Sequence, residues 1–174
     1  MFTKNMKIFA SLLIAVLFFA GCGGGFETTK TVSANDPNII TYTTPKLRVK
    51  GEFETKTYYT ELQFFCFQEG ESRSYSISAS YVTNQWPYFE KFIFTIDGSE
   101  FEFFPDRPPT RDAYNIQGPT ETITVQIPGK TVRDIYESMD TKMTIKGMDI
   151  AFDVYWKDHM KLKLYEFYKE TIEE

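Results

Sequence analysis

Two runs of alternating residues meet at Asp97-Gly98, and this pattern constrains the fold more than any other in the chain. An Asp-Gly pair in this setting is typical of a two-residue hairpin turn whose two central residues both have positive φ. Counting outward from the turn gives three facing pairs: Ile96 with Ser99, Phe94 with Phe101, and Phe92 with Phe103. This register gathers the phenylalanines on one face, which a shift by one residue would scatter. The sequence therefore predicts an antiparallel hairpin formed by 89–96 and 99–104.

Other segments with period two or with many β-branched and aromatic residues predict further strands. They are 46–54, 57–67, 72–82, 120–127, 141–145 and 148–155. The last two form a second predicted hairpin, in which a turn at Lys146-Gly147 pairs Met143 with Ile150 and Ile145 with Met148. A turn at Gly147-Met148 is the alternative. Serines occupy every second position of 72–82, which favours a solvated sheet face over a binding surface.

Apolar residues at helical spacing predict two helices. The face of the first, a short helix near 131–139, consists of Val132, Ile135, Tyr136 and Met139, with Thr131 and Asp134 as a capping pair. The second, near 157–172, turns Met160, Leu164, Phe167 and Tyr168 inward. Its early lysines and late glutamates oppose the helix dipole, so packing must supply most of its stability. The predicted fold class is α+β, a mainly antiparallel sheet of about six to eight strands with these two helices.

The N-terminal segment has the layout of an export signal. Lys4 and Lys7 precede an apolar run over 8–20, which is shorter than the roughly 20 residues of a membrane-spanning helix. The run ends in Phe19-Ala20-Gly21-Cys22, where small residues come just before a cysteine. This motif resembles the lipobox of bacterial lipoproteins, although those usually carry Leu or a similar aliphatic residue where Phe19 stands. An ordinary secretory signal with a chance cysteine is the alternative.

The resemblance implies a lipid anchor. Residues 1–21 would be the lipoprotein signal peptide, cut between Gly21 and Cys22. Cys22 would carry diacylglycerol through a thioether and become the new N-terminus, and its amine would also be acylated, by palmitate for example. Two or three acyl chains hold a protein to a membrane almost permanently. Gly23 is not Asp, which implies the outer membrane if the cell has two membranes. The expected location is thus the extracytoplasmic side of the cell envelope.

The remaining chain divides into a tether and one domain. Residues 22–45 begin with glycines and are rich in Thr, Asn, Ser and Pro, which predicts a flexible tether. Residues 46–174 are expected to form a single α+β domain. The order of elements over 89–170 resembles uncharacterised bacterial envelope lipoprotein domains, a likeness that implies no activity.

Composition and motifs exclude several functions. Removal of 1–21 takes away Lys4 and Lys7 and no acidic residue, so the formal net charge moves from −5 to −7. An acidic protein is a poor partner for nucleic acid. If Cys22 carries lipid, Cys66 is the remaining thiol, and it is expected to be a small buried hydrophobe, with a reactive nucleophile as the alternative.

The sequence contains no known catalytic motif. His159 is the only histidine, and it is expected at the surface or in a cap. The pairs Glu52 with Glu54 and Glu100 with Glu102 lie on strand faces as solvated charges. We therefore expect no enzyme, no cofactor and no metal.

One group of residues favours recognition. The strands of the 89–104 hairpin bring the loop before it and the long segment 105–119 to the same end of the sheet. Trp, Tyr and Arg are the residues that most often anchor interfaces. The predicted binding rim consists of Trp86, Tyr88, Arg107, Arg111 and Tyr114. In the alternative, Trp86 and Tyr88 plug the sheet end while Arg107 pairs with Asp106 and Arg111 pairs with Asp112.

The sequence thus predicts a non-enzymatic, lipid-anchored binding module for a protein or a glycan of the envelope or its surroundings. An inhibitor that inserts the 105–119 loop into an enzyme would belong to the same class. A structural or assembly lipoprotein is the alternative. A small hydrolase is the third, and it requires a deep pocket with two ionisable residues that are distant in sequence.

Overall fold

The computed structural model describes residues 27–53, 56–82, 86–115 and 118–173, with side chains omitted for 52, 53, 56, 57 and 173. The predicted signal peptide and Cys22 lie outside the described residues. None of the helices in these ranges has both the length and the apolar character needed to span a membrane.

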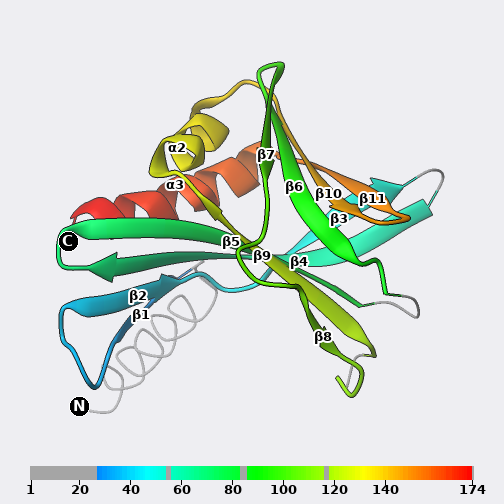
Figure 1. Cartoon of the computed structure of the whole chain (residues 1–174). Helices are drawn as coiled ribbons and strands as arrows, with labels where there is room; N and C mark the ends of the chain where they lie inside the picture. Colours follow the sequence, from blue (N-terminus) through cyan, green and yellow to red (C-terminus); the bar gives the residue numbers. More distant parts are fainter. Residues whose placement is uncertain (1–26, 54–55, 83–85, 116–117, 174) are drawn as a thin grey trace, which may run out of the picture.

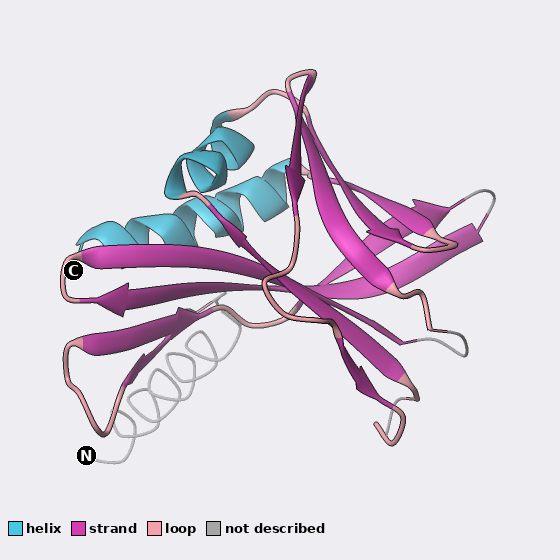
Figure 2. Ribbon diagram, viewed as in Figure 1, coloured by secondary structure: helices cyan, strands magenta, loops and turns pink. Residues whose placement is uncertain are grey.

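The fold class is α+β, as the sequence predicts (Figures 1 and 2). Over the described residues the elements run β1 (Thr29–Val32), β2 (Ile39–Thr43), β3 (Leu47–Phe53), β4 (Lys56–Glu69), β5 (Ser72–Val82), β6 (Phe89–Ile96), β7 (Ser99–Phe103), β8 (Thr110–Asp112), β9 (Thr120–Ile127), α2 (Gly129–Glu137), β10 (Thr141–Gly147), β11 (Ala151–Tyr155) and α3 (Asp158–Glu173).

The strands form one antiparallel sheet in the order β7-β6-β10-β11-β3-β4-β5-β9-β8. The long strand β4 organises it. The first half of β4 pairs with β3 up to Leu62, and its second half pairs with β2 from Phe65 onward. β5 pairs with β4 from Thr60 to Glu69 on the other side.

The sheet curls until two strands from distant places in its order meet. β6 and β9 are separated by β10, β11, β3, β4 and β5, yet they lie in contact. No ladder of backbone hydrogen bonds joins them within the described ranges. The curl therefore leaves a seam between β6 and β9. α2 and α3 contact each other and lie on one side of the strands (Figure 2).

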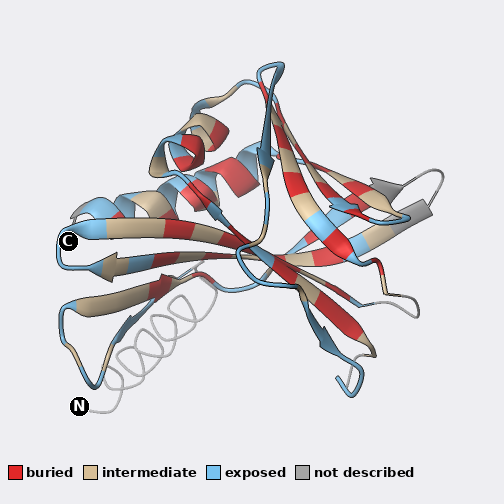
Figure 3. Cartoon of the chain, viewed as in Figure 1, coloured by how far each residue is buried: buried red, intermediate tan, exposed pale blue. Residues whose placement is uncertain are grey.

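The core lies between the inner face of the sheet and the two helices, where buried positions alternate along the strands (Figure 3). Phe64 of β4 links the layers, because its ring centroid is 6.2 Å from that of Phe167 in α3 and 5.8 Å from that of Trp156. The largest fully buried side chains are Phe64, Phe92, Phe94, Phe152, Phe167, Leu62, Ile77, Ile123, Ile135, Met143, Ile145 and Leu164. Burial of each contributes about 1.5–3 kcal/mol as an upper estimate.

The hairpin at Asp97-Gly98 has the predicted register and turn. Asp97 has φ of 46° and Gly98 of 82°. Phe94 of β6 is fully buried whereas Phe101, which faces it, is 40% exposed, because β7 is the last strand of the sheet. The Asp97 carboxylate also accepts hydrogen bonds from the backbone N–H groups of Met139 and Asp140, both at 2.9 Å. These bonds tie the hairpin tip to the segment after α2.

The predicted register of the second hairpin is wrong. Met143 faces Val154 and Ile145 faces Phe152, so the turn lies further along the chain than Lys146-Gly147. Gly147 continues β10, and its N–H donates to the carbonyl of Ile150 at 2.7 Å. The shift moves each partner by an even number of residues, so Met143 and Ile145 still face inward, whereas Met148 is 66% exposed.

Two details of the first predicted helix are also wrong. α2 begins at Gly129, so Thr131 lies inside the helix and is buried, and the N-cap Pro128 has no side-chain hydrogen bond. Asp134 pairs with Lys130 at 2.6 Å instead of capping the helix. Met139 lies beyond the end of α2 and is 95% exposed.

The C-terminal helix buries its predicted stripe and one lysine as well. Met160, Leu164 and Phe167 are buried, and Tyr168 is partly buried. Lys161 is 7% exposed, and its ammonium donates to the carbonyls of Ser138 at 2.9 Å and Met139 at 3.3 Å. This early lysine therefore joins α3 to the segment that follows α2.

The structure has more strands than the sequence predicts, because segments predicted as a tether and as a loop also pair with other strands. The boundary at residue 45 is too late, since β1 and β2 lie inside 22–45 and β2 pairs with β4 over five residue pairs. β8 lies in the segment predicted as a long loop and pairs with β9. Ile40, Tyr42 and Thr44 alternate with polar residues, which is a strand signal. The surrounding Asn, Ser and Pro are typical of a loop, and they led to the prediction of a tether.

We expect Gly147→Ala to destabilise the fold by about 1–3 kcal/mol, as overpacking does. A Cβ at this position would lie far inside van der Waals contact with the Pro87 carbonyl oxygen, which is backbone and cannot rotate away. Gly51→Ala is the matched control, because its Cβ would have an ordinary 3.4 Å contact to Phe152. Denaturant unfolding checks both variants. Equal stability of the two would contradict the close approach of the 86–89 segment to β10.

Candidate binding site

A carboxylate lies on the inner, otherwise apolar face of β9. Glu121 alternates with Thr120 and Thr122, so it points to the same side as Ile123 and Val125, and its side chain is 0% exposed. A buried carboxylate is costly unless hydrogen bonds and a cation compensate it. The hydrogen-bond donors and the cation around Glu121 therefore determine how this part of the fold is arranged.

Two backbone N–H groups at the start of β6 donate to Glu121. The N–H of Phe89 donates to Oε1 at 2.7 Å, and that of Tyr88 donates to Oε2 at 3.2 Å. β6 pairs with β7 only from Phe92 onward. The residues at the start of β6 therefore have no hydrogen-bonded strand on the edge that faces β9. The carboxylate satisfies donors that a neighbouring strand would otherwise satisfy. Glu121 thus bridges the seam of the curled sheet.

A cation on β8 completes the arrangement, which we call the Glu121 site: Glu121, Arg111, Tyr88 and the Phe89 N–H. The Arg111 Nε lies 3.2 Å from Oε2 of Glu121. The guanidinium carbon of Arg111 lies 4.4 Å from the centroid of the Tyr88 ring, within the range of a cation–π contact. The Arg111 side chain is 39% exposed, and its terminal nitrogens donate no hydrogen bond to a described residue. A fixed and partly unused guanidinium therefore faces solvent.

The backbone at Tyr88 is strained. Tyr88 has φ of 50° although it is neither Gly nor Asn, and its side chain is 44% exposed. Such a conformation costs about 1–3 kcal/mol and persists only where neighbouring contacts impose it. Here those contacts are the Glu121 carboxylate and the N–H of Met148, which donates to the carbonyls of Pro87 at 3.1 Å and Tyr88 at 3.2 Å. Strain beside an exposed aromatic side chain is frequent at functional sites.

The structure brings part of the predicted rim together. Tyr88 and Arg111 stack, and Trp86 is half-buried two residues before Tyr88. Arg107 and Tyr114 are exposed, Tyr114 to 96%, and no contact among the described residues joins them to the stack. The predicted alternative pairing of Arg111 with Asp112 is wrong, because Arg111 pairs with Glu121, and Asp112 accepts the N–H of Tyr114 at 2.9 Å.

Sequence reasoning missed Glu121, although a signal was present. Along 120–127 it is the one charged residue among apolar residues on that face, with Ile123, Val125 and Ile127. A charge on the apolar face of a strand predicts a buried group with partners. Which residues those partners are depends on the curl of the sheet, which has no local pattern.

The Cys66 thiol lies in a buried polar cluster. Cys66 is 0% exposed, as expected for a small hydrophobe, and burial raises the pKa of its thiol. The Tyr75 hydroxyl lies 3.0 Å from that of Thr171, and burial raises the pKa of Tyr75 to about 12. Both groups are therefore protonated at neutral pH, and a protonated, inaccessible thiol is a poor nucleophile.

Other candidate residues for chemistry lie apart. His159 is exposed at the start of α3. Glu102 pairs with Lys91 at 2.5 Å on the outer face of the hairpin, while the side chains of Glu52 and Glu54 lie outside the described part. Among described side chains, no three His, Cys, Asp or Glu come close enough together to hold a metal ion.

Comparison with known proteins found no family model that matches the chain, no similar curated protein and no similar solved structure.

We expect Glu121→Gln to destabilise the protein by about 2–4 kcal/mol, because an amide cannot accept from all three donors at once. Glu102→Gln is the control: it removes the same charge from an ion pair in which Glu102 is 42% exposed. Its effect should stay within about 0.5 kcal/mol. Chemical denaturation measures both. If the two variants were equally stable, the seam would not depend on the carboxylate.

Proposed function

We propose that the chain is a lipid-anchored protein of the bacterial cell envelope whose domain is a non-catalytic binding module for a protein or a glycan. Cys22 attaches it to the membrane on the extracytoplasmic side, in the outer membrane where the cell has two. The partner contacts the surface around Tyr88 and Arg111. Anchor and binding surface are separate parts of the proposal and have separate tests.

The sequence around Cys22 supports the anchor. Positive residues, an apolar run too short to span a membrane and small residues before the cysteine occur in the order that lipoprotein processing requires. Folded structure begins by Thr29, a few residues after the proposed lipid. The domain would accordingly sit close to the membrane surface, with a shorter tether than composition indicates.

One observation carries the binding part of the proposal: an exposed tyrosine in a strained backbone conformation, stacked under an arginine that buried Glu121 fixes. Aromatic and arginine side chains contribute most where their rotamers are fixed before binding, because less entropy is then lost. The Glu121 site holds both side chains in this way. A rigid pair of these residue types at the surface is suited to recognition.

We expect Cys22→Ser to abolish incorporation of an alkyne-bearing palmitate analogue in cells, since the thioether to diacylglycerol cannot form. Cys66→Ser is the matched control and should keep the label, because Cys66 is buried in the core. The label is read by fluorescence after conjugation, with recovery of the chain in the detergent phase as a second readout. Equal labelling of the two variants would rule out the anchor.

A photo-crosslinking amino acid at Tyr88 should capture one defined partner in cells, because it replaces an exposed aromatic ring of the proposed surface. Tyr165 on α3 is the matched control position, since it is 42% exposed against 44% for Tyr88. Captured material is identified by mass spectrometry for proteins and by sugar analysis for glycans. The same yield and products from both positions would contradict a binding surface at Tyr88.

A further inference from the structure

A second surface feature lies beside the Glu121 site. A hollow of about 480 Å³ opens at the end of β3, β4 and β5, within the size range of small-ligand sites. It lies next to the Glu121 site because one of its residues, Tyr81, faces Glu121 across the β5–β9 ladder. Its lining includes Arg48, Tyr58, Tyr59, Glu61, Ser80 and Tyr81.

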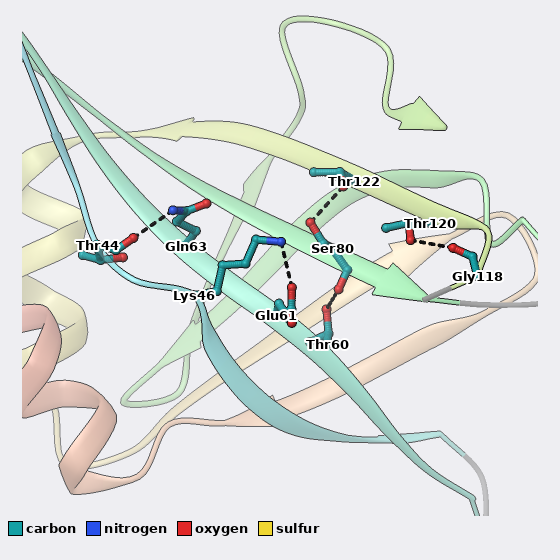
Figure 4. A network of polar contacts seen from close by, with 9 residues as sticks. All are labelled: Thr44, Lys46, Thr60, Glu61, Gln63, Ser80, Gly118, Thr120 and Thr122. Carbon is teal, nitrogen blue, oxygen red and sulfur yellow. Dashed lines mark hydrogen bonds and ion pairs between the residues drawn. The ribbon is translucent and has the colours of Figure 1, made fainter. Parts of the chain in front are cut away.

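Arg48 brings a positive charge to this hollow that no described residue neutralises. It faces Glu61 in the β3–β4 ladder, but the Glu61 carboxylate pairs with Lys46 at 2.9 Å (Figure 4). The guanidinium carbon of Arg48 lies 4.4 Å from the centroid of the Tyr59 ring. Arg48 makes no hydrogen bond or ion pair within the described ranges. A guanidinium that rests over a ring can still donate its N–H groups to an anion, and a carboxylate fits its fork.

Residues that carry hydroxyl groups also line the hollow, namely Tyr58, Tyr59, Thr60, Ser80 and Tyr81. The Thr60 hydroxyl donates to the Ser80 carbonyl at 2.8 Å, and the hydroxyls of Ser80 and Thr122 lie 2.8 Å apart (Figure 4). Either hydroxyl of this pair can be the donor, and of the two residues only Ser80 lines the hollow. The Tyr59 phenol, 53% exposed, has no hydrogen bond to a described residue. The hollow therefore offers aromatic surface, hydroxyl groups, the Arg48 cation and the Glu61 carboxylate, whose charge Lys46 compensates.

We propose that this hollow binds a saccharide unit that carries a carboxylate, of the uronic acid type. A sugar ring is amphipathic, with C–H faces that pack on tyrosine rings and hydroxyls that bond to the rim. Arg48, which no described residue neutralises, selects for the acid over a neutral sugar, because a ligand carboxylate would give it a charge-assisted, bidentate partner. A sugar ring fits the tyrosine-lined hollow better than an acidic peptide does, because the short stems of Asp and Glu offer little C–H surface to the aromatic rings. The proposal does not depend on the lipid anchor.

The test uses the full-length protein in detergent micelles, titrated by calorimetry with digalacturonate and with the neutral digalactose of the same linkage. We expect digalacturonate to bind at least about tenfold more tightly, and Arg48→Gln to remove most of that preference. Lys50→Gln is the matched control, because Lys50 is an exposed cation on the same face of β3 that does not line the hollow. It should change affinity less than about twofold. Tyr59→Phe should weaken binding without altering the acid preference.

Several results would overturn the proposal. Digalacturonate that fails to bind at about 10 mM, or binds no better than digalactose, removes the ligand class. Equal losses in Arg48→Gln and Lys50→Gln would show general charge attraction instead of a site. Acetate binding as tightly as digalacturonate would show that the sugar ring contributes nothing, and tighter binding of a Glu-Glu dipeptide would favour a peptide. Thermal unfolding of each variant distinguishes a lost contact from a lost fold.

Discussion

At the seam of the curled sheet, the Glu121 carboxylate accepts hydrogen bonds that a neighbouring strand would otherwise accept. β6 and β9 meet without a backbone ladder among the described residues, and donors at the start of β6 would face an apolar interior there. Glu121 accepts two of them and an arginine, which compensates its own burial. The bridge acts together with the Met148 N–H, which donates to the carbonyls of Pro87 and Tyr88. The position of Tyr88, its strained backbone and the stacking of Arg111 follow from these contacts.

The same bridge also fixes side chains that the protein presents at its surface. Because Arg111 is held through Nε and by the Tyr88 ring, its terminal nitrogens stay at the surface in a fixed direction. Gly147 is required on the opposite side, where the Pro87 carbonyl approaches β10 too closely for a side chain. An aromatic residue and a cation are thus fixed by the packing of three separate segments. Arg48 over Tyr59 repeats this Arg-on-Tyr stack next to the Glu121 site.

The sequence predicts an element correctly where residue types and their spacing agree locally. It predicts an element wrongly where a contact with a residue distant in the sequence determines the structure. The Asp97-Gly98 hairpin has its predicted turn and register because both are encoded within sixteen residues. The second hairpin was assigned the wrong register because Gly147 serves the Pro87 contact instead of a turn. β2 was assigned to a tether because its strand partner, the far half of β4, has no local signature. Likewise Tyr88 and Arg111 were identified by residue type, whereas Glu121, which joins them, was not.

Hydrogen exchange at the backbone amides of Tyr88 and Phe89 tests the bridge most directly, measured by NMR on the full-length protein. Both amides donate to a carboxylate with no exposed surface, so we expect them to exchange as slowly as amides in the interior of β6. Exchange at the rate of an open loop, with the rest of β6 protected, would contradict the account: the seam would then be held by packing alone.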